Sequence, residues 1–440
     1  MTIRRIKQAQ PARTDRRIRV NTAIEHPKSK VPAPRPAHRV RPAALPGVPA
    51  GPAGAPPDEE GVLGALTEKL FVSLARSDQR RKGSDYLRGL LSTPGRKSIR
   101  NMASLIGDSA TGQGLHHFIC NSTWDWTPVR RALAAHLLRT APPVAWVVRP
   151  LTIPKVGRHS VGVGRYFSSA EGQMITAQRA IGVWMASDRV SVPVEWRLHL
   201  SEPPRTALDC GGVRIPARPD PGLLAEHAAQ ACLAVASWGA PVRPAVLDLD
   251  GADPLPALER LRAAGLHAVA RVPEDVELRV EEPALTGHHG RTLPAGSIMR
   301  ASRELRRPVI RGTGGGPRPV RRPPLMATVR VGRPVPGPAD PAGTAPGGGL
   351  TLVGLGPGGP DWPGELWLTT YPADRAAMAV SRSADLVDRV GRSLASVGDR
   401  VGVRDYAGRS FNGWHRHITL ASAAYAVAEL AGNAGAPHRP

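Results

Sequence analysis

The chain has 440 residues, which is enough for one large domain or two ordinary ones with tails. Its 59 Lys and Arg residues exceed its 36 Asp and Glu residues, and the formal net charge of +23 favours a polyanionic partner such as nucleic acid, although a GC-rich codon bias explains part of the excess. The three cysteines form no CxxC pair and no run of about 18 apolar residues occurs, so we expect neither a cysteine-rich zinc site nor a transmembrane helix.

Residues 1–60 predict a disordered, basic tail. Arginines cluster at its start, and Pro, Ala and Gly then dominate up to Pro57. Such a segment cannot bury enough apolar area to offset its conformational entropy. A basic arm can still hold phosphates, and a mistaken upstream start codon is an equally good explanation. The first residues also lack the apolar stretch of a secretory signal.

Residues 61–141 predict a small all-α domain. Apolar residues recur at helical spacing over 63–74 and again over 86–91. A Thr-Pro-Gly breaker at 93–95 ends the second helix, and a third helix follows over about 96–106. This order of helix, short turn and basic helix is typical of a helix-turn-helix.

The third helix is the candidate DNA reader. Arg96, Lys97 and Arg100 lie outside its apolar stripe, where they could contact DNA, whereas an ordinary helical hairpin with a solvated basic face is the alternative. A fourth helix opens near Trp124, with Thr127 as its predicted N-cap and Pro128 at its first position.

Residues 142–434 change to a pattern of strands followed by alternating helices and strands. Strands are predicted over 145–148, 172–186, 189–200, 245–248, 267–272 and 365–370, and helices over 223–238, 255–264, 375–397 and 418–430. This order predicts an α/β fold, a mixed sheet with flanking helices. The stretch 281–364, rich in Arg, Gly and Pro, predicts a basic and largely irregular insertion looped out of that domain.

Several sequence blocks carry a family resemblance through their order and spacing. They are Tyr-Leu-Arg-Gly-Leu-Leu at 86–91 with Arg-Lys-Ser at 96–98, the segment 124–130, Pro-Lys-Val-Gly-Arg-His-Ser-Val-Gly-Val at 154–163, Pro-Val-Glu-Trp-Arg-Leu-His-Leu at 193–200, and the closing motif Gly-Trp-His-Arg-His-Ile-Thr-Leu at 413–420. From about Leu66 to Leu430, except in the basic stretch, the chain resembles the insertion-sequence 701 group of DDE transposases.

This resemblance implies a fold, a chemistry and a partner. The fold is an RNase H-like mixed sheet in which two Asp at strand ends and a Glu on a late helix bind two divalent ions. Mg²⁺ or Mn²⁺ takes oxygen ligands at such a site, and the two ions activate the attacking oxygen and neutralise charge on the leaving one. DNA is the implied partner, and metal-dependent cleavage and strand transfer are the implied activity.

Two of the three acid positions no longer hold acids in this chain. The first corresponds to Arg149 or Pro150, the second to Asp248, and the third, counted back from the closing motif, to Gly391. An arginine cannot ligate a cation. Asp388 lies nearly one helical turn before Gly391 and is the nearest substitute. If the chain is active, Asp248 is the metal ligand that remains.

These positions lead to a structural expectation. We expect Arg149, Asp248 and Gly391 to lie together at the ends of two strands and on a facing helix, with the guanidinium of Arg149 paired to Asp248. Asp250 or Asp253 could assist Asp248.

Five other basic residues are candidate DNA contacts. Lys155 and Arg158 follow a strand and could hold phosphates, with a solvated surface as the alternative. His415, Arg416 and His417 belong to the closing motif, where packing or phosphate contact is favoured over a zinc site.

The leading hypothesis is therefore a transposase-like DNA-binding protein that is catalytically inactive, either a relic or a retained regulator. An active DDE transposase with displaced ligands and a generic basic scaffold for nucleic acid are the alternatives. We expect no cofactor unless the chain is active, no membrane contact, and a location in the cytoplasm with the nucleoid. A homodimer is an open alternative because the sequence does not give the oligomeric state.

Overall fold

The computed structural model describes residues 59–107, 109–157, 160–168, 172–200, 224–309, 323–334 and 349–434. They belong to one compact unit. The predicted tail lies outside the described residues except for Glu59 and Glu60, which open α1. In the described part of the chain, no helix is both long enough and apolar enough to cross a membrane.

The N-terminal region is helical, as predicted, with two additional elements. The helices are α1 (Glu59–Leu70), α2 (Ser77–Ser92), α3 (Ile99–Ile106), α4 (Ser109–His116), the π-helix η1 (His117–Asn121) and α5 (Trp126–Thr140). The helices α4 and η1 were not predicted, because the Ser, Gly and Thr residues around them are poor helix formers.

Side-chain caps correct two predicted helix starts. The amide of Asn101 donates to Ser98 Oγ at 3.2 Å, so α3 begins at Ile99 and not near 96. The amide of Thr127 donates to Asp125 Oδ1 at 2.9 Å, so the N-cap of α5 is Asp125 and not Thr127. Arg96 and Lys97 therefore precede the helix that was expected to carry them.

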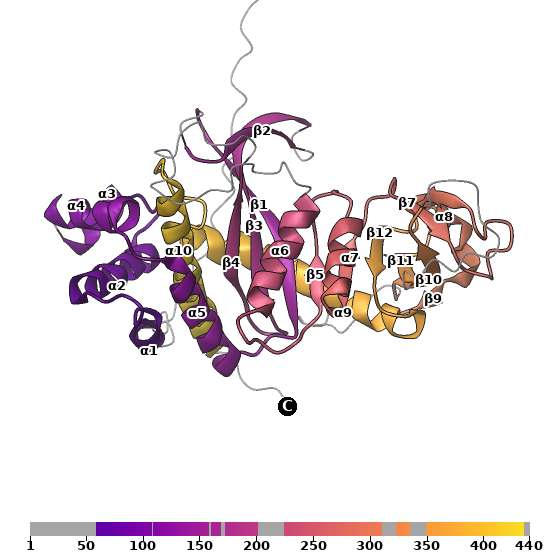
Figure 1. Cartoon of the computed structure of the whole chain (residues 1–440), viewed down its shortest axis with the longest axis horizontal. Coiled ribbons are helices and arrows are strands. Elements are labelled where there is room, and N and C mark those ends of the chain that lie inside the picture. Colours follow the sequence, from indigo (N-terminus) through magenta and orange to yellow (C-terminus); the bar gives the residue numbers. More distant parts are fainter. Residues whose placement is uncertain are drawn as a thin grey trace, which may run out of the picture. The chain divides into compact units, whose positions relative to one another are not determined.

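The first half of the mixed sheet has the predicted α/β architecture (Figure 1). An antiparallel meander of β1 (Ala145–Pro154), β3 (Gln173–Ala186) and β4 (Ser191–His199) carries the hairpin partner β2 (Val163–Ser168) on β3. The strands β5 (Ala245–Leu247) and β6 (Ala268–Arg271) continue the sheet in parallel with β1. This mixed sheet is consistent with the predicted RNase H-like fold.

Helices cover both faces of this sheet. In Figure 1, α6 (Leu224–Ala236) and α7 (Leu255–Ala263) lie in front of the strands, and α9 (Ala373–Ser393) passes behind them and continues into the π-helix η4 (Leu394–Gly398). Coverage of both faces explains why β1 and β5 are almost continuously apolar instead of alternating in character.

The prediction that 281–364 is irregular and looped out is wrong for its described part. This part contributes β8 (Thr292–Pro294), α8 (Ala295–Ala301), the 3-10 turn η3 (Arg303–Leu305), β9 (Arg307–Pro308), β10 (Leu325–Gly332) and β11 (Leu350–Gly356), between β7 (Glu277–Val280) and β12 (Glu365–Thr369).

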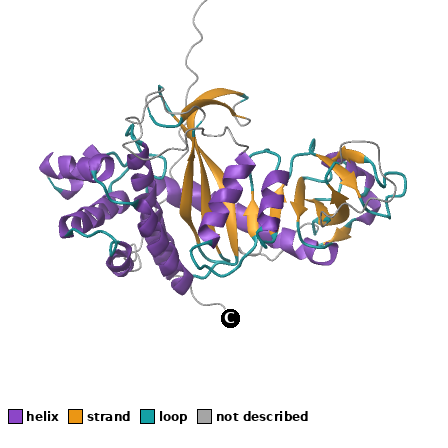
Figure 2. Cartoon of the chain, viewed as in Figure 1, coloured by secondary structure: helices purple, strands orange, loops and turns teal. Residues whose placement is uncertain are grey.

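These strands extend the same sheet. The strand β12 pairs antiparallel with β6, and the order continues through β11, β10, β7 and β8. Figure 2 shows strands throughout this part of the chain. The apolar runs of β10 and β11 are short and are flanked by Gly-, Pro- and Arg-rich segments. The composition of the whole stretch therefore predicted irregular structure and not these strands. Residues 310–322 and 335–348 of this stretch lie outside the described part.

The last helix, α10 (Phe411–Ala434), joins the N-terminal helices to the sheet, because it packs against α1, α2, α5 and β4. A buried arginine on α5 reinforces the junction. The guanidinium of Arg130 donates to Glu195 Oε1 at 3.1 Å, to the carbonyl oxygen of Trp196 at 2.9 Å and to Thr419 Oγ1 at 2.8 Å. A charge this deeply buried is tolerated only when it is paired and hydrogen-bonded.

The closing motif is part of this junction, and the prediction that its basic residues contact DNA is wrong. His415, Arg416 and His417 are all buried on α10. The guanidinium of Arg416 donates to two backbone carbonyls of the segment before α5, each at 3.1 Å. His417 Nε2 is 3.0 Å from the carbonyl oxygen of Gly402, and its Nδ1 is 2.8 Å from the hydroxyl of Tyr86. These side chains hold helices together and cannot reach a phosphate.

This burial predicts a pH-dependent stability. Desolvation lowers the pKa of His417 from 6.5 to about 4, so between these values the unfolded chain binds a proton that the folded chain does not. The contribution of this imidazole to the free energy of unfolding should therefore be fully present above pH 6.5. It should fall as the pH decreases towards 4, by up to about 1.4 kcal/mol per pH unit. We expect His417→Gln to reduce this dependence, as measured by urea unfolding across the window, while the buried His415, whose pKa is also lowered by desolvation, keeps a dependence of the same sign.

The exposed His116 offers a matched control. The variant His116→Gln should keep the pH dependence of the native chain. If His417→Gln keeps it as well, the buried imidazole is not its source.

Candidate functional site

Three neighbouring parallel strands bring three charged residues together: Arg149 lies within β1, Asp248 directly follows β5, and Arg271 ends β6. Val148 of β1 pairs with Leu247 of β5, and Leu247 pairs with Ala270 of β6. The residues that follow these partners, Arg149, Asp248 and Arg271, therefore occupy neighbouring positions on one sheet. The short apolar β5 positions Asp248 because the amide of Asp248 donates to the carbonyl oxygen of Val148 at 3.0 Å.

Two guanidinium groups bracket the carboxylate of Asp248. Arg149 Nη2 lies 3.0 Å from Asp248 Oδ2, and Arg271 Nη1 lies 3.6 Å from Asp248 Oδ1. The side chain of Asp248 is only 7% exposed, and that of Arg149 is 23% exposed, so solvent screens the closer pair weakly. The ion pair between Arg149 and Asp248 was predicted from the sequence, and the structure contains it.

The third acid position faces the same guanidinium from α9. A Cβ atom added to Gly391 would lie 2.8 Å from Arg149 Nη1, and the same nitrogen is 3.5 Å from the carbonyl oxygen of Val387. The expected proximity of Arg149, Asp248 and Gly391 is therefore confirmed. Pro150, the other candidate for the first position, points to the opposite face of β1 because side chains alternate along a strand.

Sequence reasoning missed the second half of the cluster. Arg271 Nη2 lies 3.5 Å from Glu365 Oε1, and the guanidinium of Arg271 stacks over the ring of Trp367 at 5.1 Å. Trp367 Nε1 in turn donates to Glu365 Oε2 at 3.0 Å. The result is a row of alternating charge that runs from Arg149 through Asp248 and Arg271 to Glu365. Arg271 ends a predicted strand, but only the pairing of β6 with β5 and β12 reveals its partners.

The nearby acids do not replace the missing ones. Asp250 pairs with Arg179 at 3.5 Å, and burial raises the pKa of Asp250. Asp253 Oδ1 accepts a hydrogen bond from the amide of Leu255 at 2.9 Å and so caps the start of α7. Asp388 is exposed on α9, and among the described residues no ion pair or hydrogen bond joins it to Asp248.

The residues present do not fit two divalent cations. Of Arg149, Asp248 and Gly391, only Asp248 has a carboxylate, and both of its oxygens face guanidinium groups. Within the described residues, no group of three or more His, Cys, Asp or Glu side chains is arranged to hold a metal ion. Hard divalent ions need several oxygen ligands, and here the guanidinium of Arg149 lies between Asp248 and Gly391.

The candidate DNA contacts near α3 divide into exposed and buried residues. Arg96 and Arg100 are exposed. Lys97 is buried, and its ammonium donates to the carbonyl oxygen of Thr93, while burial lowers the pKa of Lys97. The prediction that Lys97 contacts DNA is therefore wrong, because this ammonium closes the turn between α2 and α3.

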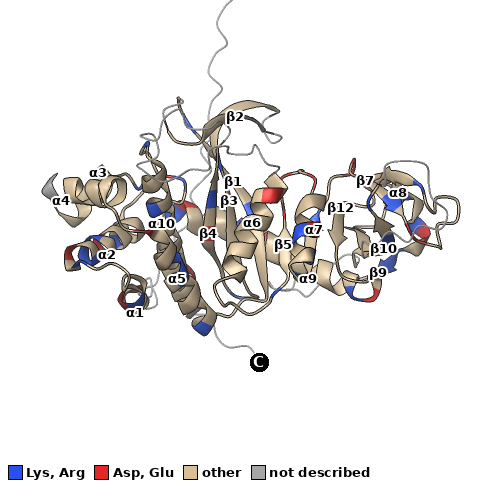
Figure 3. Ribbon diagram, in the orientation of Figure 1, with Lys and Arg blue, Asp and Glu red and all other residues tan. Residues whose placement is uncertain are grey.

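Lys155 has an intramolecular partner as well. Its ammonium donates to the carbonyl oxygen of Tyr406 at 2.7 Å, and burial lowers the pKa of Lys155. Arg158 lies outside the described residues. Exposed basic positions remain on the N-terminal helices, where Figure 3 shows Lys and Arg along α2.

The motif blocks and the three-strand site converge on one family. The model of the family described as DDE superfamily endonuclease matches residues 69–313, which is more than half of the chain and includes Arg149 and Asp248. No curated protein matches the chain. Together with the mixed sheet, the family match shows that this chain belongs to the DDE superfamily endonuclease family.

Proposed function

We propose that this DDE-family chain binds DNA without cutting it. The observation that carries the proposal is the ion pair between Arg149 and Asp248, formed where the family binds metal, with Gly391 leaving room for the guanidinium. The resemblance of the motif blocks to the insertion-sequence 701 group, with two of its three acid positions changed, supports this proposal. A relic of an inactivated element and a retained DNA-binding regulator both agree with this proposal.

Electrostatics supports the loss of metal-dependent cleavage. The row of Arg149, Asp248, Arg271 and Glu365 has no net formal charge, whereas three carboxylates would supply three negative charges. At an effective dielectric constant of about 20, unit charges about 4 Å apart interact by about 4 kcal/mol, so one guanidinium would repel a divalent ion by about 8 kcal/mol. Asp248 and Glu365 already offset the two guanidinium groups, so no negative charge is left over to attract a divalent ion.

The N-terminal helices support DNA binding. Arg96 and Arg100 flank the first turn of α3, both are exposed, and no acidic side chain among the described residues pairs with either. Lysine and arginine contacts to phosphate release counterions, which gives DNA binding its salt dependence. The helix-turn-helix of α2 and α3 and a homodimeric assembly remain parts of the proposal.

Calorimetry with Mn²⁺ tests the degenerate site. We expect the native chain to bind no pair of Mn²⁺ ions and to show no Mg²⁺-dependent DNA cleavage. The double variant Arg149→Asp with Gly391→Glu should regain Mn²⁺ binding, because it removes the guanidinium and restores two oxygen ligands. Tight binding of two ions by the native chain, abolished by Asp248→Ala, would instead establish an active transposase with displaced ligands.

Titration of DNA at several salt concentrations tests the reader helix. We expect Arg96→Ala with Arg100→Ala to weaken binding and to reduce the slope of log K against log salt by about two, since each lost phosphate contact removes about 0.9. The matched control is Arg300→Ala with Arg307→Ala, which removes two exposed arginines from the region of α8 and β9. Equal losses from both pairs would point to a generic basic scaffold.

A further inference from the structure

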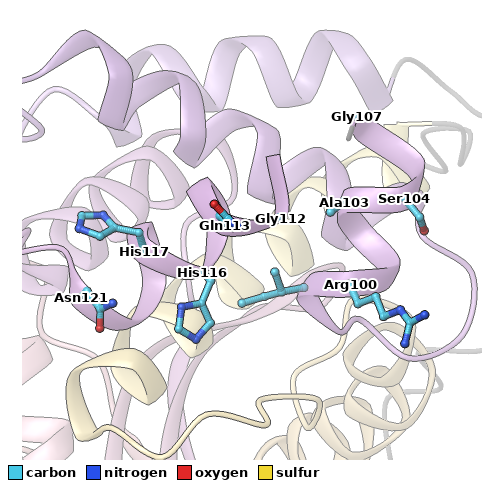
Figure 4. Close-up of a pocket in the computed structure, with 10 residues that line it drawn as sticks. Arg100, Ala103, Ser104, Gly107, Gly112, Gln113, His116, His117 and Asn121 are labelled. Carbon is cyan, nitrogen blue, oxygen red and sulfur yellow. The ribbon is translucent and has the colours of Figure 1, made fainter. Parts of the chain in front are cut away.

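A groove lies between α3 on one side and α4 with η1 on the other (Figure 4). It has a volume of about 650 Å³, which is within the range of about 300–1,000 Å³ that holds small ligands. Figure 4 shows Arg100 and Ala103 on the α3 side, opposite Gln113, His116 and Asn121.

The floor and the rim of this groove differ in chemistry. Two apolar residues of α3 lie deepest, because Ala103 is buried and Ile99 is half-buried. The rim side chains of Gln113, His116 and Asn121 are exposed. An apolar floor with an amide and imidazole rim suits a flat, heteroaromatic ligand whose edge carries hydrogen-bonding groups.

The rim is available to a ligand. Within the described residues, the side chains of Arg100, Gln113, His116 and Asn121 form no hydrogen bond or ion pair with the protein. None of the ten residues that line the groove is acidic, so its charge complements a phosphate-bearing strand.

The π-helix shapes one wall of the groove. The amide of Ser122 donates to the carbonyl oxygen of His117 at 2.8 Å, which is the wide turn of a π-helix. Such turns are rare and often occur at functional sites. The side-chain amide of Asn121, at the end of this π-helix, lines the same groove as that of Gln113, eight residues earlier on α4.

We infer that this groove binds an unpaired base of a DNA strand, with Arg100 beside the phosphate of the same nucleotide. The inference rests on the proposed DNA-binding function and adds the feature of DNA that is recognised. In a paired duplex the faces of the bases are stacked, so only base edges and the backbone are accessible. The floor of Ile99 and Ala103 can be covered by a base only when that base has left the stack.

The amides supply the hydrogen bonds that an exposed base requires. Asn and Gln side chains carry both a donor and an acceptor, which matches the edge of a base once its pairing partner is gone. The histidine ring at the rim adds a surface on which a base can stack.

The test compares two DNA probes by fluorescence anisotropy at one salt concentration. One is a blunt, fully paired duplex, and the other is the same duplex with one unpaired nucleotide. We expect the full native chain to bind the second probe about tenfold more tightly, which is the effect of stacking one base. The double variant Gln113→Ala with Asn121→Ala should lose this preference and keep both its affinity for the blunt duplex and its salt dependence, because it changes no charge.

The variant Asn433→Ala is the matched control, because it removes an amide from α10 that does not line the groove, and it should keep the preference. Thermal unfolding verifies that each variant is folded. Equal binding of the two probes by the native chain, or a preference that survives in Gln113→Ala with Asn121→Ala, would overturn the inference and leave DNA binding intact. Failure to bind either probe would overturn the proposed function itself.

Discussion

The parallel pairing of β5 between β1 and β6 is the constraint on which the candidate site depends. This register sets Arg149, within β1, beside the carboxyl ends of β5 and β6, so that Arg149, Asp248 and Arg271 meet on one sheet. Both faces of the sheet are covered by helices, so a one-residue slip would bury charges in the core. The strand register that the core requires therefore also fixes the positions of these three charged residues.

Within this frame, Arg149 and Gly391 act as a matched pair. The guanidinium lies so close to α9 that any larger residue at 391 would clash with it, since even a Cβ there would lie 2.8 Å from Arg149 Nη1. The nearly buried Asp248 would be costly if left unpaired, because a buried charge that loses its partner keeps its full desolvation penalty. The arginine thus stabilises the fold by compensating the nearly buried carboxylate of Asp248.

The closing motif has a role that depends on burial. Arg130 and Arg416 carry charge into the junction of α10 with the N-terminal helices, and each compensates by donating several hydrogen bonds. These basic residues hold the helical region against the sheet and leave the open groove of α3, α4 and η1 on the surface. The excess positive charge of the chain therefore does not show which basic residues contact DNA, since the most buried cations hydrogen-bond within the protein.

The sequence by itself determined the mixed α/β class and most of the helices and strands outside 281–364, because apolar periodicity is a local signal. The family resemblance of the motif blocks singled out Arg149, Asp248 and Gly391. Tertiary structure decided the rest. Only strand pairing brings Arg271 to Asp248, only packing shows that Lys97 and His417 are buried, and only the sheet order reveals β10 and β11 inside a basic stretch. Burial and strand neighbours are set by contacts distant in sequence, which composition and spacing do not encode.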